Sequence, residues 1–188
     1  AYEAAVQASG ELSEAKWNLS LVQLVKGNYL EGWSHYRYRP SADRARHSLP
    51  TEILPKTLNG YRISLEGEQG LGDELFFLRF VPELMERGAL VSYLGDDRLS
   101  DILGRALPGL VDPATSASRG ELCLTLSIAD LPYLLASSEV PETLRIKPLE
   151  RYTDVVRQRL YNAGPPPYTG FTCRAGLQGE GALYKEAP

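Results

Sequence analysis

A glycine-rich stretch that ends in an acid is the part of the sequence best suited to chemistry. Residues 66–73 read Glu-Gly-Glu-Gln-Gly-Leu-Gly-Asp, between a strand-like run at 61–65 and a helix-like run at 74–87. A glycine-rich turn between strand and helix lets a ligand approach the backbone, and the free N–H groups of the helix point at that ligand. The pattern is typical of a nucleotide, phosphate or sugar site in an open α/β sheet.

The glycine spacing excludes two common nucleotide sites. Gly70 and Gly72 would begin a G-x-G-x-x-G dinucleotide fingerprint, but Leu75 stands at the third position and no Gly-Lys-Ser/Thr follows. The loop offers an acid instead, Asp73, at the mouth of the helix. Its carboxylate could take a proton from an attacking hydroxyl, or it could simply cap the helix, which typically stabilises by ~1 kcal/mol. Both interpretations stay open, and they are compatible.

The other polar residues of this region have more ordinary alternatives. Glu68 and Gln69 are expected either to contact a ligand or to hydrogen-bond the loop. Gly70 and Gly72 are expected to be required by the turn itself. Arg79, two turns into the helix, is expected to form a buried ion pair with a neighbouring carboxylate rather than to contact substrate.

Strands and helices alternate after residue 60, which predicts a parallel sheet with helices on both faces, a Rossmann-like domain over 61–164. The expected elements are strands at 61–66, 89–94, 110–111 and 121–127, and helices at 74–87, 97–106, 131–136 and 151–161. Gly-Pro-Pro-Pro at 164–167 reads as a hinge. Residues 165–188, with a strand-like run at 168–173, would begin another lobe.

The N-terminal 39 residues are predicted to be helical. Gly27-Asn28 interrupts the apolar pattern and indicates two helices joined by a turn, either a plain helical hairpin or a tetratricopeptide repeat. Residues 1–8 would be the last helix of a preceding repeat. Residues 40–60, which carry three prolines and Asn59-Gly60, read as a linker.

Composition excludes several classes of protein. The 188 residues carry a net charge of −4, which gives no reason to expect nucleic acid or an anionic membrane as partner, and no apolar run reaches the length of a membrane span. Cys123 and Cys173 lack the C-x-x-C spacing of a zinc site. Reduced cysteines buried in strands of a cytoplasmic protein are the simplest interpretation.

Four motifs occur along the chain in a fixed order. They are Glu31-Gly32-Trp33-x-x-Tyr36-x-x-Arg39, Glu68-Gln69-Gly70-Leu71-Gly72-Asp73-Glu74-Leu75-x-Phe77-x-Arg79-Phe80, Ser127-Ile128-Ala129-Asp130-Leu131-Pro132 and Gly170-Phe171-Thr172-Cys173-Arg174-Ala175-Gly176. Together they resemble the bacterial tetratricopeptide-repeat glycosyltransferases, whose catalytic part has a two-lobed GT-B-type fold similar to the heptosyltransferases. The most specific element is the Glu-Gln-Gly-Leu-Gly-Asp loop.

The resemblance implies a role for several residues. Residues 61–164 would be the N-terminal, acceptor-side lobe, and Asp73 matches the proposed general base of the heptosyltransferases. Lys185, in Lys-Glu-Ala-Pro, matches a K-x-x-P element whose lysine contacts donor phosphate. Arg174 matches the arginine of a W-R-x-G element, in which Cys173 stands where the family has tryptophan.

The function implied is transfer of a sugar from a nucleotide-sugar donor to a hydroxyl on a protein acceptor held by the repeats. Glu68, Gln69, Gly70 and Gly72 would contact substrate, Arg174 and Lys185 would contact donor, and neither a metal nor a resident cofactor is expected. The chain would be a fragment whose donor lobe is missing, inactive by itself. The alternative is a non-catalytic repeat scaffold with a silent Rossmann-like domain; a nicotinamide or flavin enzyme is disfavoured by the missing third glycine.

Overall fold

The computed structural model describes residues 13–40, 51–68, 70–112 and 122–170. The chain divides into two compact units, 1–147 and 148–188, which are treated separately. Within the described residues, no helix combines the length and the apolar character needed to cross a membrane.

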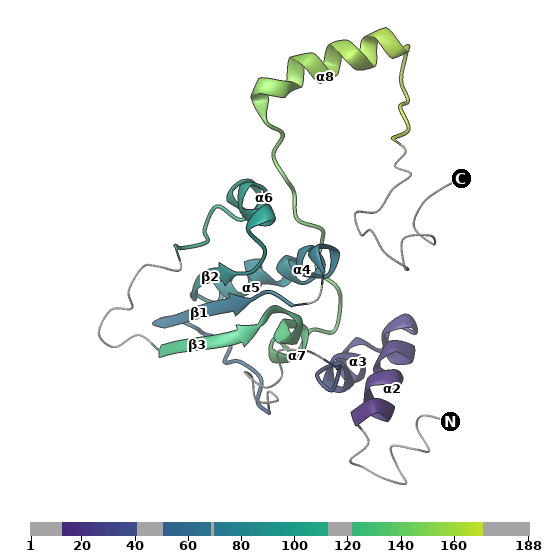
Figure 1. The fold of residues 1–188 in the computed structure, drawn as a ribbon. Coiled ribbons are helices and arrows are strands. Elements are labelled where there is room, and N and C mark those ends of the chain that lie inside the picture. Colours follow the sequence, from purple (N-terminus) through teal and green to yellow (C-terminus); the bar gives the residue numbers. More distant parts are fainter. Residues whose placement is uncertain (1–12, 41–50, 69, 113–121, 171–188) are drawn as a thin grey trace. The chain divides into compact units, whose positions relative to one another are not determined.

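A parallel sheet of three strands forms the centre of the first unit (Figure 1). Its strands are β1 (Tyr61–Glu66), β2 (Leu90–Leu94) and β3 (Leu122–Ser127), in the order β2-β1-β3. Ile63 of β1 lies opposite Val91 on one side and Leu124 on the other. Ile63 and Val91 are completely buried, so the central strand is part of the core. The parallel α/β arrangement expected from the sequence is confirmed.

In this strand order, the chain adds β2 on one side of β1 and then β3 on the other, so the winding of the sheet reverses between β1 and β3. From β1 the chain passes through α4 (Leu71–Phe77), η1 (Leu78–Phe80) and α5 (Val81–Glu86) to β2 at one edge. From β2 it passes through η2 (Asp97–Leu99) and α6 (Ser100–Ala106), and then reaches β3 on the opposite side of β1. In open parallel sheets, ligands bind at the carboxyl ends of the strands where the winding reverses. Here that place lies beyond Glu66 and Ser127.

Two predicted elements differ in the structure. The helix expected at 74–87 begins at Leu71 and is divided by a 3₁₀ turn before Pro82, which has no N–H to donate and crowds the carbonyl one turn earlier. The strand expected at 110–111 is absent. The Leu110 N–H donates to the Leu107 carbonyl at 3.1 Å within a turn, and the Val111 N–H donates to the Val91 carbonyl of β2 at 2.8 Å.

The first unit also contains a pair of helices, α2 (Ser13–Val25) and α3 (Tyr29–Tyr36), joined by a turn in which Gly27 has φ +79°. A Cβ at Gly32 would lie 2.7 Å from Leu24 Cδ2, so the two helices approach closely where Gly32 has no side chain. The predicted helical hairpin is confirmed. Its assignment as a tetratricopeptide repeat stays a prediction, and the helix expected at 1–8 lies outside the described residues.

Aromatic side chains join the hairpin to the helices that follow β1. Trp33 packs against Phe77 and Phe80 with ring centroids 6.3 Å apart in each pair, and Trp17 packs edge-on against Tyr36 at 5.0 Å. The linker also contributes to the core, because Leu58 is completely buried and its N–H donates to the Arg87 carbonyl at 2.6 Å. The hairpin and the sheet therefore share one hydrophobic core.

After β3 the chain forms η3 (Ile128–Asp130) and α7 (Leu131–Leu134), shorter than the helix expected at 131–136. Cys123 is exposed on β3, so its predicted burial was wrong; β3 has a neighbour on one side only among the described strands. In the second unit, α8 (Glu150–Ala163) extends slightly beyond the expected 151–161 and buries none of its side chains. Residues 168–170 form no strand, and the rest of that predicted strand is outside the described residues.

Candidate functional site

The loop between β1 and α4 lies at the carboxyl edge of the sheet, and Gly67 fixes its start. The Gly67 N–H donates to the Leu94 carbonyl of β2 at 3.2 Å. A Cβ at Gly67 would lie 2.8 Å from Gly95 Cα and 2.9 Å from the Glu74 carboxyl carbon. A side chain at position 67 would require the backbone at Gly95 to move, which is energetically unfavourable, so this position requires glycine.

The two glycines singled out in the sequence are not required by the backbone, which corrects that expectation. Gly70 is extended, with φ −106° and ψ 166°, a conformation that any residue adopts. Gly72 lies inside α4, and a Cβ there would meet nothing within 4 Å. Glycine in a helix is less favourable than alanine by about 1 kcal/mol. Gly72 therefore leaves open space beside the helix without any local need for it.

Asp73 is exposed and belongs to the first turn of α4 rather than preceding the helix. Gly70 is the N-cap residue, and Asp73 Oδ2 accepts the Gly70 N–H at 3.2 Å. This is the carboxylate half of a capping box. Asp73 therefore caps the helix from its third position, and its exposed carboxylate keeps room for a further hydrogen bond.

The next residue, Glu74, is buried and helps to hold the loop. Its Oε2 accepts the Tyr93 hydroxyl and, at 3.3 Å, the Asp96 N–H. Burial raises the pKa of the Glu74 carboxyl above its ordinary value; the charges of Asp96 and Asp73 add to this, and the Asp96 N–H and Arg98 oppose it. Two consecutive acids thus face different surroundings, Asp73 in solvent and Glu74 in the protein.

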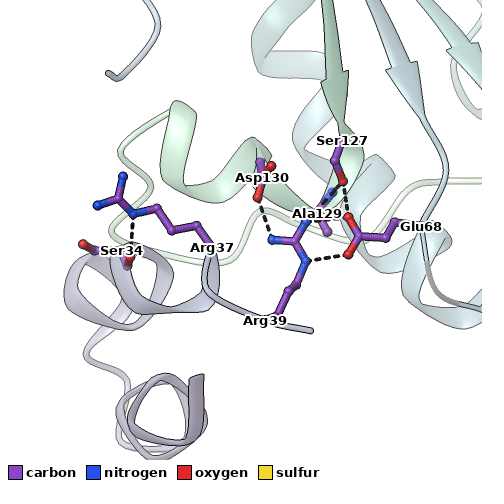
Figure 2. A network of polar contacts seen from close by, with 7 residues as sticks. All are labelled: Ser34, Arg37, Arg39, Glu68, Ser127, Ala129 and Asp130. Carbon is purple, nitrogen blue, oxygen red and sulfur yellow. Dashed lines mark hydrogen bonds and ion pairs between the residues drawn. The ribbon is translucent and has the colours of Figure 1, made fainter. Parts of the chain in front are cut away.

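A buried ion network lies at the reversal point between β1 and β3 (Figure 2). Arg39, which follows the hairpin, reaches this point with its guanidinium. Arg39 Nη2 lies 2.5 Å from Glu68 Oε2, and Nη1 lies 2.6 Å from Asp130 Oδ1. Ser127, at the end of β3, donates its hydroxyl to Glu68. We call Arg39, Glu68, Ser127 and Asp130 the Arg39 network.

All four members of the Arg39 network are buried. Burial opposes the charge of Arg39, but the hydrogen bonds and charges of Glu68 and Asp130 outweigh it and raise the pKa of Arg39 above its ordinary value. Such a network connects the hairpin, the loop after β1 and the turn after β3. The Arg39 side chain therefore occupies the place at which open parallel sheets bind their ligands.

The sequence did not assign a role to Arg39, Ser127 or Asp130, although each belongs to one of the quoted motifs. The convergence of three motifs on one network is the signal that could have identified them. Glu68 was expected either to contact a ligand or to hydrogen-bond the loop. Its carboxylate binds Arg39 and Ser127, which lie outside the loop.

Arg79 makes no ion pair with a described carboxylate, which corrects that expectation. Its Nη1 donates to the Pro141 carbonyl at 3.3 Å, its guanidinium lies 4.6 Å from the centre of the Phe76 ring, and its Nε is buried without a hydrogen-bond partner. Arg79 lines two cavities, of about 360 Å³ and about 480 Å³. Gly72 lines the smaller one.

Three predicted site residues, Gln69, Arg174 and Lys185, lie outside the described residues. Within the described part of the chain, no group of three or more histidine, cysteine, aspartate or glutamate residues could hold a metal ion. The structure therefore brings together Asp73, Gly70 and Gly72 at the start of α4, with Glu68 engaged in the neighbouring Arg39 network.

No protein-family model matches the chain, and no solved structure matches it. Protein FlbA of Caulobacter vibrioides is similar to it, with 29% identity over 116 residues that cover 56% of this chain. The same region is 20% of FlbA, so the chain spans about a fifth of the length of this curated relative. The likeness identifies no reaction.

Proposed function

We propose that the chain is the acceptor-side part of a glycosyltransferase that moves a sugar from a nucleotide-sugar donor to a hydroxyl on a protein. The observation that carries this proposal is the position of Asp73. It is an exposed carboxylate on the first turn of the helix that follows the central strand, at the carboxyl edge of a parallel sheet. Next to it, Gly72 lines a cavity of about 360 Å³.

In this proposal Asp73 acts as general base. An acceptor hydroxyl hydrogen-bonded to the free part of the carboxylate gives up its proton as its oxygen attacks the anomeric carbon, and the nucleotide leaves with the electron pair of the broken bond. The Gly70 N–H holds the carboxylate in place. Arg174 and Lys185 would contact donor phosphate through charge-assisted hydrogen bonds.

The helical hairpin would hold the acceptor protein as part of a tetratricopeptide array. Its attachment to the sheet suits this role, because the Trp33 aromatic contacts and the Arg39 network give it a fixed position relative to Asp73. Positioning an acceptor accurately next to a base contributes much of the rate in group transfer.

One observation favours a second candidate, a non-catalytic scaffold. The Arg39 guanidinium fills the reversal point between β1 and β3, where a sheet of this kind receives a ligand. In a scaffold the α/β part would serve only to support the repeats, and Asp73 would only cap α4.

Substitution of Asp73 in the full-length protein that contains this chain separates the two candidates. Asparagine retains a hydrogen-bond acceptor for the Gly70 N–H but is not basic, so Asp73→Asn should lower sugar transfer by about 10²–10⁴-fold with little change in Tm. Transfer is measured by mass spectrometry of the acceptor with uridine, cytidine and guanosine sugar nucleotides. Asp101→Asn, an exposed acid in the first turn of α6, is the matched control. Transfer by Asp73→Asn at the wild-type rate would contradict the proposal.

A further inference from the structure

The smaller cavity beside Arg79 forms a groove between α4, α6 and residues 141–147, a segment without helix or strand that we call the strap. Its walls are apolar, with Leu75 and Phe76 from α4, Ile102 from α6, and Leu144 and Ile146 from the strap. A cavity of about 360 Å³ is large enough to receive a side chain or a small ligand. We call it the strap groove.

Gly72 keeps one wall of the strap groove open. It is exposed, its backbone is helical, and a Cβ would meet no atom within 4 Å. Neither the fold of the loop nor the packing of the helix explains a glycine at this position, which a helix disfavours. Access to the groove does explain it, because any larger residue would extend into the opening.

Arg79 gives the strap groove a charge preference. Its hydrogen bond to Pro141 is a single long contact, its Nε has no partner, and no described carboxylate pairs with it. A guanidinium has five N–H donors in a planar fork that matches a carboxylate. The larger cavity, on which Arg79 also borders, includes Glu83, Glu86 and Glu139, whereas the strap groove has no acidic residue in its lining. An anion is therefore favoured on the groove side.

The strap provides a reason to expect a peptide. Within the described residues, the main chain of Thr143, Leu144 and Ile146 makes no hydrogen bond to other backbone. An irregular segment with free N–H and C=O groups can bind an extended peptide through its main chain, while neighbouring pockets select the side chains.

We propose that the strap groove binds an extended polypeptide segment in which an aliphatic side chain adjoins an acidic one. The aliphatic group lies among Leu75, Ile102 and Leu144, and the carboxylate pairs with Arg79. Gly72 of the groove adjoins Asp73 in sequence, so a peptide in the groove would lie near the proposed general base. That this peptide is also the sugar acceptor rests on the proposed function. Peptide binding itself needs neither the donor nor the reaction.

Binding is tested on the 188-residue chain by titration followed through amide chemical shifts. The probe is acetyl-Ala-Ser-Leu-Asp-Ala-amide, compared with the same peptide carrying Asn for Asp or Ser for Leu. Loss of a hydrogen-bonded charge pair should weaken binding about tenfold for the Asn peptide. Shifts should concentrate at Gly72, Ile102 and Leu144. N-acetyl-leucine tests whether a small carboxylate suffices, and binding as tight as that of the peptide would overturn the polypeptide assignment.

Substitutions in the chain test whether the peptide binds in the strap groove. Gly72→Leu fills the opening without strain and should abolish the shifts, and Arg79→Gln should weaken binding about tenfold and remove the preference for Asp over Asn. Gly104→Leu is the matched control, because Gly104 is also an exposed helical glycine with nothing within 4 Å of a Cβ. No saturable shift, equal binding of the Asp and Asn peptides, or unchanged binding by Gly72→Leu would overturn the proposal. Peptide binding with no sugar transfer would leave this inference standing and remove only the proposed reaction.

Discussion

Two neighbouring regions lie at the carboxyl edge of the sheet, and they differ in whether their charged side chains are buried and paired or accessible. In the Arg39 network, a buried guanidinium is shared by two buried carboxylates and closes the reversal point. At the start of α4, Asp73 is exposed. In η1, Arg79 lines two cavities; it donates one hydrogen bond, to Pro141, and lies over the Phe76 ring, but it pairs with no carboxylate among the described residues. Satisfied buried charges hold elements together, whereas accessible ones next to a groove can meet a ligand. The first region therefore holds the architecture together, and the second is the one for which we propose a reaction and a ligand.

The largest effect is expected from breaking the network. Arg39→Met leaves Glu68 and Asp130 buried without their shared cation, and loss of one partner of a buried pair typically costs about 3–5 kcal/mol. The free energy of unfolding, measured by urea denaturation, should fall by about that amount. Arg98→Met, which removes the exposed partner of Asp96, is the control and should change little. A small effect of Arg39→Met would show that the network is not what holds the hairpin to the sheet.

The loop provides a second comparison, between Gly67, which leaves no space for a Cβ, and Gly72, which does. A Cβ at Gly67 would press on the Gly95 backbone, so Gly67→Ala should destabilise by about 1–3 kcal/mol, the usual range for overpacking. Thermal unfolding measures it, with Gly104→Ala as control for the substitution itself. An unchanged Tm would mean that β1 and β2 can separate at this edge without cost.

The buried carboxyl of Glu74 makes the stability of the protein depend on pH. Because burial raises the folded-state pKa of Glu74 above the ordinary 4.5, the folded protein retains this proton longer than the unfolded chain. The contribution of Glu74 to stability is therefore fully present below pH 4.5 and is lost as pH rises through the folded-state pKa. The difference in unfolding free energy between wild type and Glu74→Gln, measured across that range, should shift against wild type as pH increases. A constant difference would contradict the raised pKa.

The smallest effect is expected at the open end of the helix. Gly72→Ala adds a methyl group that meets no atom, so it should stabilise the protein by about 0.5–1 kcal/mol through helix propensity. Calorimetry or urea denaturation detects a change of this size. Destabilisation instead would show that the space beside Gly72 is closed in solution, and it would remove the opening on which the strap groove depends.

Much of the fold was predictable because it depends on local pattern. The alternating run at 61–66 gave β1 with correct bounds, and the apolar spacing interrupted at Gly27-Asn28 gave two helices. The ends of the elements were predicted less accurately than their order. Asp73 was taken as the residue before the helix, but Gly70 takes the cap and α4 begins at Leu71. The start of a helix depends on which N–H groups find partners, and an Asp suits either position.

The candidate site was predictable only in part. The sequence pointed to the Asp73 loop because a strand, glycines and a helix stand in order. It could not show that Glu68 faces Arg39, a partner 29 positions away. It also placed the steric need for glycine at 70 and 72 instead of 67, because that need arises from Gly95, the residue that follows the neighbouring strand β2.

The sequence alone thus determined the parallel α/β pattern, the helical hairpin and the position of an acid at the loop, since each follows from residues close together in the chain. Tertiary structure decided which charges are buried and which stay accessible. Arg39, Glu68 and Asp130 become one network only when hairpin and sheet pack together, and Arg79 faces a groove only because the strap passes beside α4. Burial and pairing depend on distant neighbours, and a linear pattern does not contain them.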